Sequence, residues 1–330
     1  MPTDPVISLA EARRLAGSEA WVPLCREYDR IERGTPPEPS LAVILAEAQM
    51  RVGDPRLARE LLREALPEFE HVGDTITHCR ACNMLGAAHF ELGDLDRAEK
   101  AFALVLERAS AVRSDLLVAR STNNLGLIAN IQKRHDEAIG QFHLAAAAFQ
   151  QAGNTAGLAE THHNIAIAYR DLEQWDQAEK AERRAIEYSS EAGNHRLLAM
   201  AQTGRAELKL LYGEAEVAEA GASLAADTCR AIPDPVGEAD ALRLVAAARL
   251  SLGELQEAKE PVDRAVVLAR RHGSALVEAE ALRVRARLLA VQGNSARARG
   301  DAQEAVALYA RLGAESDRDS LEAWLRRAFS

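Results

Sequence analysis

The heptapeptide LGDLDRA stands at residues 92–98, and its close variant LGELQEA stands at residues 252–258, 160 residues later. The last alanine of both belongs to a series with a constant spacing of 40 residues. That series consists of Ala58, Ala98, Ala138, Ala178, Ala218, Ala258 and Ala298. A small residue that returns seven times without a slip in register predicts a tandem repeat with a 40-residue unit.

Two further columns of small residues keep the same spacing. Seven residues after the first series stand Ala65, Val105, Ala145, Ala185, Ala225, Ala265 and Ala305. Twelve residues before it stand Ala46, Gly86, Gly126, Ala166, Ala206, Ala246 and Ala286, which we call the Gly/Ala column. Small side chains let two helices approach to about 8 Å, so the columns predict where helices of one repeat pack against each other.

Turn residues divide each repeat into two parts. One break is a glycine followed by Asp, Glu or Asn, at Gly53, Gly93, Gly213, Gly253 and Gly293. The other break contains Gly73, Gly153, Gly193, Gly273 and Gly313. Glycine at the end of one helix and a capping side chain at the start of the next are typical of helix junctions. Each repeat is therefore predicted to be a pair of helices of roughly 15 to 18 residues, and stacked pairs form an α-solenoid.

The composition excludes several classes of function. Hydrophobic residues make up 48% of the chain and aromatic residues 4%, and the net charge is −10. This charge argues against general binding to nucleic acids or anionic membranes. The N-terminus lacks the features of a secretory signal and no run of about 18 apolar residues occurs, which predicts a cytoplasmic protein. The four cysteines, Cys25, Cys79, Cys82 and Cys229, are too scattered to suggest a disulfide framework.

The second repeat carries a resemblance to a known family. Its order of Leu85-Gly86, His89, Ala98, Phe102 and Val105 resembles the tetratricopeptide repeat (TPR) over residues 38–313. The 40-residue period is similar to the long-helix variety in kinesin light chain, Pins-type adaptors and bacterial peptide-pheromone receptors. The resemblance implies an all-α, right-handed superhelical solenoid of about seven helix-turn-helix units. Departures from the pattern are Lys133-Arg134 and Glu173-Gln174 in place of Gly-Asp turns, and Glu182 and Ala222 in place of an aromatic or large apolar residue.

Both ends of the chain depart from the repeat, as capping units of a solenoid do. Residues 1–37 are predicted to form an irregular capping hairpin with apolar contacts from Ile7, Leu9, Leu15, Trp21, Val22, Leu24 and Ile31. The segment GTPPEPS at 34–40 breaks this hairpin, although Pro36, Pro37 and Pro39 could instead mark a linker. Residues 314–330 are predicted to form a C-terminal capping helix with an apolar stripe of Leu321, Trp324, Leu325 and Phe329.

The resemblance also implies that the first helix of every repeat lines a concave groove. Positions six, three and two residues before the Gly/Ala column, and one and four after it, should face that groove. In the second to fourth repeats these positions, or their immediate neighbours, are Arg80, Asn83, Arg120, Asn123, Asn124, Asn130, His163, Asn164 and Arg170. An asparagine amide can pair with an extended peptide backbone, and arginine presents a fork that fits a carboxylate.

Two positions within that set carry a more specific implication. In related receptors an asparagine two residues before the small column contacts the peptide backbone, and Asn124 and Asn164 hold this position here. Arg243 and Arg283 recur one repeat apart, with Arg287 one turn further, and could form a basic end of the groove for an acidic partner. Both groups could instead be a solvated helix face.

Other chemistry finds little support in the sequence. His78, Cys79 and Cys82 could begin a metal site, but no second close pair of ligands follows, so core thiols are favoured. The doublet His162-His163 could act as a base or sense pH, although adjacent helical residues face different directions. No catalytic or nucleotide-binding motif occurs.

The resulting hypothesis is a non-catalytic scaffold that needs no cofactor. It would hold an extended peptide or a partner's tail, possibly acidic or C-terminal, in its groove, with neither nucleic acid nor membrane as a partner. The alternatives are a structural solenoid that assembles as a homo-oligomer, or a sensor that acts through a separate effector.

Overall fold

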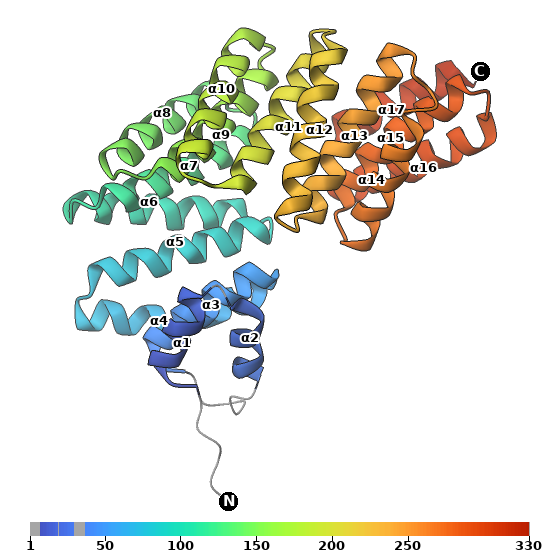
Figure 1. The fold of residues 1–330 in the computed structure, drawn as a ribbon. Coiled ribbons are helices and arrows are strands. Elements are labelled where there is room, and N and C mark those ends of the chain that lie inside the picture. Colours follow the sequence, from blue (N-terminus) through green and yellow to red (C-terminus); the bar gives the residue numbers. More distant parts are fainter. Residues whose placement is uncertain (1–6, 19, 30–36, 330) are drawn as a thin grey trace, which may run out of the picture. The chain divides into compact units, whose positions relative to one another are not determined.

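The computed structural model describes residues 7–18, 20–29 and 37–329 (Figure 1). All regular structure in these residues is α-helix. The chain divides into two compact units, Met1–Gly157 (unit 1) and Leu158–Ser330 (unit 2).

Unit 1 holds the first eight helices. They are α1 (Leu9–Gly17), α2 (Trp21–Asp29), α3 (Pro39–Val52), α4 (Pro55–Val72), α5 (Thr75–Glu91), α6 (Leu95–Ala111), α7 (Asp115–Ile131) and α8 (His135–Gln151). From α3 onward these helices form the three hairpins α3/α4, α5/α6 and α7/α8, each of which contacts the next along the chain.

Unit 2 holds the other nine described helices, the first of which begins in the last residues of unit 1. They are α9 (Thr155–Asp171), α10 (Trp175–Glu191), α11 (His195–Leu211), α12 (Ala215–Ala231), α13 (Pro235–Leu252), α14 (Lys259–Arg271), α15 (Ala275–Val291), α16 (Ser295–Leu312) and α17 (Glu315–Ala328). Helices α11 to α16 repeat the hairpin arrangement, and α17 packs on α16.

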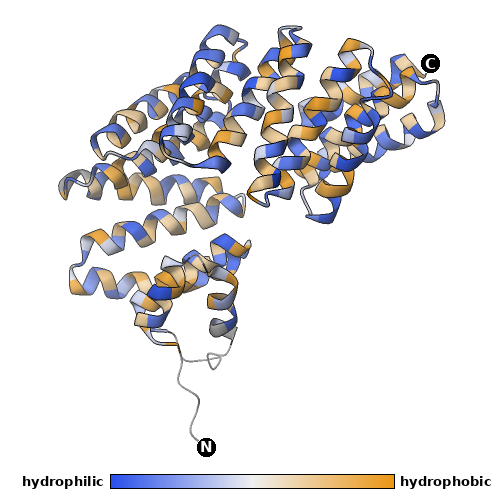
Figure 2. Ribbon diagram, in the orientation of Figure 1, coloured by the Kyte–Doolittle hydropathy of each residue, from blue (hydrophilic) through white to orange (hydrophobic). Residues whose placement is uncertain are grey.

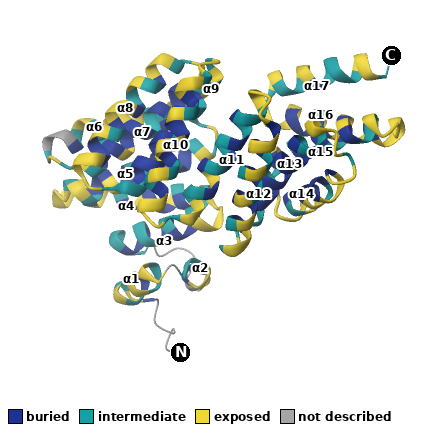
Figure 3. Cartoon of the chain, turned by 45° about the horizontal axis from the view of Figure 1, so that its top comes forward, coloured by how far each residue is buried: buried dark blue, intermediate teal, exposed yellow. Residues whose placement is uncertain are grey.

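The three small-residue columns form the contact lines that the sequence predicts. Every alanine and the valine in these columns is at most 3% exposed, and Gly86 and Gly126 are buried. Buried residues lie between helices and exposed ones at the turns and outer surfaces, as Figure 3 shows. Polar and apolar residues accordingly share each helix (Figure 2). These observations confirm an α-solenoid of helix-turn-helix units.

The glycines of the second and third repeats make room for aromatic rings. A Cβ atom added to Gly86 would lie 2.6 Å from Cε1 of Phe102, and one added to Gly126 would lie 2.6 Å from Cε1 of Phe142. Both phenylalanines are almost fully buried. The ring of the second helix therefore occupies the space that a side chain on the first helix would need.

Two of the predicted junctions lack glycine but keep its backbone conformation. Lys133 has φ 62° and Glu173 has φ 58°, in the left-handed region that Gly93 and Gly213 occupy at the equivalent positions of other repeats. A residue with a Cβ costs roughly 1 to 2 kcal/mol in this region. The packing of the flanking helices therefore determines the turn here, rather than the intrinsic preference of the residue.

In each unit the first helices of successive hairpins lie side by side. Helix α5 contacts α3 and α7, and α13 contacts α11 and α15. Contacts of this kind between successive second helices are weaker or absent in the described parts of the chain. The first helices therefore form the narrower side of each stack, and we call this surface the first-helix face.

The described residues of the N-terminal segment contribute apolar side chains to the adjoining core, except for Val22. Ile7 and Leu24 are buried, and Leu9, Leu15 and Trp21 pack against the same core, but Val22 is 53% exposed and is not an apolar contact. Val22 faces solvent because α2 is a short helix that buries only one side. Ile31 and Pro36 lie outside the described residues.

At the C-terminal end, Leu321 is buried and Trp324 and Leu325 pack against the adjoining core. The Phe329 ring lies edge-on to Trp324, with a centroid distance of 5.6 Å. Among the described helices, none combines the length and the apolar character needed to cross a membrane.

The contact between Gly126 and Phe142 gives a test of the packing. Gly126→Ala should destabilise the protein by about 1 to 3 kcal/mol, because the added methyl group overpacks the ring. The matched control is Gly140→Ala on α8, where nothing lies within 4 Å of the added carbon. The control should be neutral or stabilising by up to about 1 kcal/mol. Urea unfolding of both variants measures the difference, and equal stabilities would refute the packing argument.

Candidate functional site: the first-helix faces

The first-helix face of unit 1 presents two unpaired arginines. Arg80 on α5 and Arg120 on α7 occupy equivalent positions one repeat apart, and both are exposed. Neither forms an ion pair with any residue in the described segments. Because α5 and α7 are neighbours, the two guanidinium groups belong to one continuous surface.

An asparagine pair lies next to these arginines. Asn83 Oδ1 accepts hydrogen bonds from Ser121 Oγ at 3.4 Å and from Asn124 Nδ2 at 3.5 Å. Both distances are long for hydrogen bonds of these types, so the two bonds are weak. They use the oxygen of Asn83 and the nitrogen of Asn124, and they leave Asn83 Nδ2 and Asn124 Oδ1 to bond outside this pair. Asn83 and Asn124 are both half-buried.

The other predicted asparagines are placed differently. Asn123 is only 3% exposed and Asn164 only 8% exposed, and each makes an interaction within the chain. The expectation that both amides are open to the groove is therefore not met, although Asn83 and Asn124 hold the same two positions of the repeat and are half-buried. Asn130 Oδ1 lies 2.8 Å from His135 Nδ1, which ties Asn130 to the start of α8.

In unit 2, His163 on α9 forms a buried ion pair with Glu182 on α10. His163 Nδ1 lies 2.9 Å from Glu182 Oε1, and Glu182 is 2% exposed. Glu182 stands where Phe102 and Phe142 stand in earlier repeats, so the departure noted in the sequence marks a change from an apolar to an ionic contact.

The pKa values of both partners are raised. Burial acts to lower the pKa of His163, but the Glu182 carboxylate outweighs it and raises that pKa above its ordinary value, with Glu160 adding to the effect and Arg170 opposing it. Burial raises the pKa of Glu182, against the opposing effect of His163. The folded state therefore holds protons on this pair more tightly than the unfolded chain does.

A ladder of ion pairs continues along the first-helix face of unit 2. Arg170 Nη1 lies 2.6 Å from Glu207 Oε2 on α11, and the other Glu207 oxygen lies 3.5 Å from Arg243 Nη2 on α13. Arg243 Nε lies 2.6 Å from Asp240 and 2.7 Å from Glu280 on α15. Burial opposes ionisation of Glu207, but Arg243 and Arg170 outweigh it and lower the pKa of that carboxyl.

This ladder assigns different environments to the predicted arginines. Arg243 is buried among three carboxylates, which differs from the expected open position for an acidic partner. Arg283 has one distant partner, Asp317, at 3.7 Å, and Arg287 has no ion pair or hydrogen bond within the described chain. Asp240 and Glu280 recur one repeat apart in the sequence, whereas Glu207 has no acidic equivalent in the neighbouring repeats, and their pairing with Arg243 needs the three-dimensional register.

The histidine and cysteine residues of α5 form a core contact. Cys82 Sγ lies 3.6 Å from His78 Nδ1, and that nitrogen lies 3.1 Å from Arg108 Nη1. Burial raises the pKa of the Cys82 thiol to about 11, so it remains protonated and unreactive. Across the described residues, no group of three or more His, Cys, Asp or Glu side chains is arranged to hold a metal ion.

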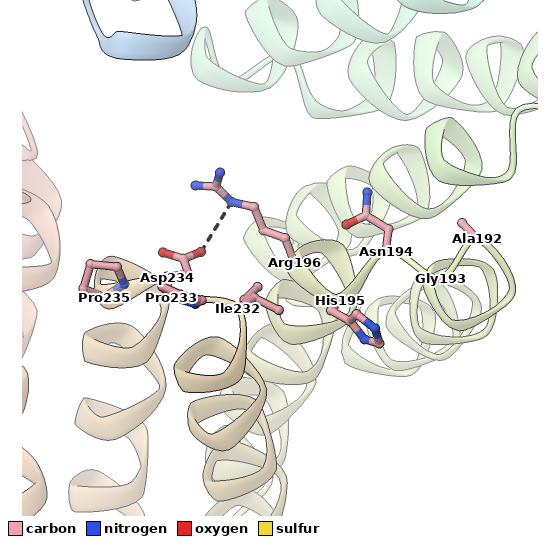
Figure 4. A pocket seen from close by; sticks show the side chains of 9 residues that line it. All are labelled: Ala192, Gly193, Asn194, His195, Arg196, Ile232, Pro233, Asp234 and Pro235. Carbon is pink, nitrogen blue, oxygen red and sulfur yellow. Dashed lines mark ion pairs between the residues drawn. The ribbon is translucent and has the colours of Figure 1, made fainter. Parts of the chain in front are cut away.

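A cleft of about 620 Å³ lies elsewhere, between the turns that precede α11 and α13 (Figure 4). Three of its polar side chains are engaged within the chain: Asn194 and Asp234 cap their own helices, and Arg196 Nε lies 3.3 Å from Asp234 Oδ2. None of the predicted site residues lines this cleft. The chemistry of the first-helix faces is therefore separate from it.

The fold and its faces define a repeat solenoid of helical hairpins. Residues 80–111 and 117–191 match profiles of the tetratricopeptide repeat. Residues 80–111 and 117–191 therefore carry tetratricopeptide repeats. No curated protein sequence matches it.

Several solved structures share the fold. A STAND protein with a tetratricopeptide repeat sensor from Pyrococcus horikoshii has a TM-score of 0.69 and 15% identity, covering 96% of this chain and 48% of its own. A Rap protein complexed with competence and sporulation factor has a TM-score of 0.61 and 12% identity, covering 97% and 96%. The quorum sensor NprR from B. thuringiensis, in its apo form, has a TM-score of 0.60 and 13% identity, covering 98% and 97%.

At these identities the likeness concerns the fold alone. The chain spans about half the length of the STAND protein, so it corresponds to only part of that molecule. The Rap and NprR structures match over nearly their whole lengths.

The His163–Glu182 pair predicts a pH dependence of stability. Since the folded pKa of His163 is raised, its contribution is complete below the unfolded value near 6.5 and is lost as pH rises through the folded pKa. The raised pKa of Glu182 acts in the same direction. The free energy of unfolding, measured in urea from pH 6 to 9, should therefore fall more steeply for the wild type than for Glu182→Gln. The exposed His143→Gln serves as control, and identical slopes for all three proteins would contradict the assignment.

The ion-pair ladder predicts unequal effects at two equivalent arginines. Arg243→Met leaves three carboxylates without their cation and should cost about 3 to 5 kcal/mol. Arg283→Met, one repeat later, removes only the contact with Asp317 and should cost less than about 1 kcal/mol. Chemical unfolding measures both, and similar losses would show that Arg243 does not organise the ladder.

Proposed function

We propose that the protein is a non-catalytic scaffold or sensor component that binds an extended peptide, or an extended segment of a partner protein, on its first-helix faces. The observation that carries the proposal is the surface of Arg80, Asn83, Arg120 and Asn124 in unit 1. Two exposed arginines without ion pairs in the described chain stand beside two half-buried amides.

The chemistry of this surface suits a peptide with acidic groups. The amides of Asn83 and Asn124 offer a donor and an acceptor to the backbone of an extended segment. The guanidinium groups of Arg80 and Arg120 offer planar forks to carboxylates. Asn130 would serve as a peripheral contact in unit 1. On the separate first-helix face of unit 2, Arg170 and the small exposed parts of His163 and Asn164 would offer polar contacts to a segment bound there.

The structural relatives give further support to this class of function. One is a Rap protein in complex with competence and sporulation factor, and another is a quorum sensor. A sensor role would require this chain to pass its bound state to a separate effector. Self-assembly through the chain ends has less support, because Trp21 lies under Arg51 and Trp324 lies against Phe329, so neither indole is a fully open apolar surface.

A displayed library of random peptides tests the proposal. Peptides that bind the wild type should include acidic sequences, and Arg80→Gln/Arg120→Gln should weaken them by about tenfold or more, because charge-assisted hydrogen bonds are lost. Asn124→Ala should weaken acidic and neutral ligands alike, because it removes a backbone contact.

The matched control is Arg56→Gln/Arg63→Gln, which makes the same change in charge on α4, a second helix of the same unit. Circular dichroism confirms that each variant is folded. If every selected peptide binds the wild type, the control and both site variants equally, the first-helix face of unit 1 is not the binding surface.

A further inference from the structure

Another cleft of unit 2 differs in its chemistry from the cleft in Figure 4. It has a volume of about 490 Å³ and lies between the start of α10 and the end of α11. The residues that line it are Glu173, Gln174, Trp175, Asp176, Gln177 and Tyr212. These lining residues include two aromatic rings and two carboxylates, and none of them is basic. We call this site the aromatic cleft, and its composition suits a ligand of positive charge.

The aromatic pair is specific to this junction of the solenoid. Trp175 is the first residue of α10, and Tyr212 directly follows the last residue of α11, 37 residues later. One repeat further along the chain the same offset joins Ala215 to Leu252. Packing at the junction therefore does not require aromatic side chains, and the two rings are available for recognition.

Neither carboxylate of the aromatic cleft forms an ion pair with another described residue. Asp176 Oδ1 accepts a hydrogen bond from the Tyr212 hydroxyl at 3.1 Å, which leaves the negative charge of Asp176 without a cation. The side chain of Glu173 is exposed and has neither a hydrogen bond nor an ion pair within the described chain. The cleft therefore keeps two negative charges that a cationic ligand can neutralise.

Glu173 carries its carboxylate at a turn position where glycine is the usual residue. Its φ of 58° lies in the left-handed region, and Gly93 and Gly213 at equivalent positions have φ of 77° and 79°. The Cβ atom makes this conformation less favourable for glutamate than for glycine. A side chain that is kept at such a cost favours a role for the group that it carries.

The surroundings of the Tyr212 ring are negative. Lys209 Nζ lies 5.4 Å from the centre of this ring, so the ring already attracts one cation of the chain. Glu179 at 3.7 Å and Glu214 at 3.2 Å neutralise Lys209, which does not line the cleft. Burial and the hydrogen bond to Asp176 raise the pKa of Tyr212, and the charges of the nearby carboxylates act in the same direction. The phenol therefore stays neutral, and its ring remains suited to a cation.

We propose that the aromatic cleft binds the guanidinium or ammonium group of a basic side chain on a partner protein. Cation–π attraction holds this group against the rings of Trp175 and Tyr212, and the carboxylates of Glu173 and Asp176 neutralise it. The amide oxygen of Gln174 accepts a hydrogen bond from its N–H groups. The net charge of −10 favours the approach of a basic partner. The inference does not rest on the proposed function, because the cleft lies at helix ends and not on a first-helix face.

Three peptides added to the full chain test the proposal: acetyl-Gly-Arg-Gly amide, acetyl-Gly-Lys-Gly amide, and the citrulline analogue of the first, which has a similar shape without the charge. NMR cross-peaks of the indole N–H groups report on each tryptophan, and the peak lost in Trp175→Phe is that of Trp175. At least one cationic peptide should shift this peak saturably, and the citrulline peptide should not. The cationic peptide that binds more tightly identifies the side chain that the partner presents.

Two variants separate binding from folding. Glu173→Gly introduces the residue of the equivalent turns, so its melting temperature should stay the same or rise. Its affinity for the cationic peptide should fall by about threefold or more, because a carboxylate is lost. The matched control Lys133→Gly makes the same backbone change in unit 1 and should bind like the wild type. Leucine occupies the equivalent position 252, so Tyr212→Leu should fold and should weaken binding by about fivefold or more.

The proposal is overturned if neither cationic peptide shifts the Trp175 peak, if the citrulline peptide shifts it equally, or if the peaks of Trp21 and Trp324 respond as strongly. It is also overturned if Glu173→Gly binds as tightly as Lys133→Gly, or if Tyr212→Leu keeps the affinity of the wild type. A purely structural role of Glu173 would appear as a lower melting temperature of Glu173→Gly with unchanged binding.

Discussion

The close approach of two helices at a small residue is the constraint on which the rest of the structure depends. Where a buried aromatic ring covers that residue, as Phe142 covers Gly126, no Cβ atom fits. The ring and the glycine come from different helices of one hairpin, so their fit fixes how those helices pair. The same fit occurs 40 residues earlier between Phe102 and Gly86, and buried small residues hold the column position in the other repeats. Each side chain on a first helix therefore has a predetermined neighbour one repeat away.

In unit 2 the same positions carry different chemistry. Glu182 takes the place of the ring, and its carboxylate approaches the next first helix so closely that a Cβ on Gly204 would lie 2.2 Å from Oε1. The residue without a side chain lies here at another position, two residues before the column residue Ala206 on the next hairpin, and it makes room for a carboxylate. A buried carboxylate needs a cation, and His163 supplies it within the same hairpin. One geometric rule thus supports apolar packing in one unit and ionic packing in the other.

The sequence predicted the helices and contact lines well, because both depend on a periodicity that every repeat restates. It predicted the site less well. Asn123 and Asn164 are buried, whereas Asn83 and Asn124 at the same positions of the repeat are half-buried, so the position alone does not determine exposure and the side chains of the neighbouring helices decide it. The neutralisation of Arg243 was missed for a related reason: its partners are 36 and 37 residues away. Reading the columns as offsets between repeats would have paired them.

The sequence offsets between arginines and their carboxylate partners also explain which arginines on the first-helix faces keep a positive charge that a ligand can bind. In a chain of net charge −10, Arg170 and Arg243 on the first-helix face of unit 2 have carboxylates within reach, and these ion pairs connect neighbouring hairpins. An arginine keeps an unpaired charge where the residues at these offsets are neutral. Ala247 lies 36 residues before Arg283 and Ser320 lies 37 residues after it, whereas the same offsets from Arg243 lead to Glu207 and Glu280. An acidic ligand is repelled by the molecule as a whole and attracted only at these positions. Selectivity between ligands then depends on the unpaired arginines, because a ligand must present its carboxylates where those arginines lie.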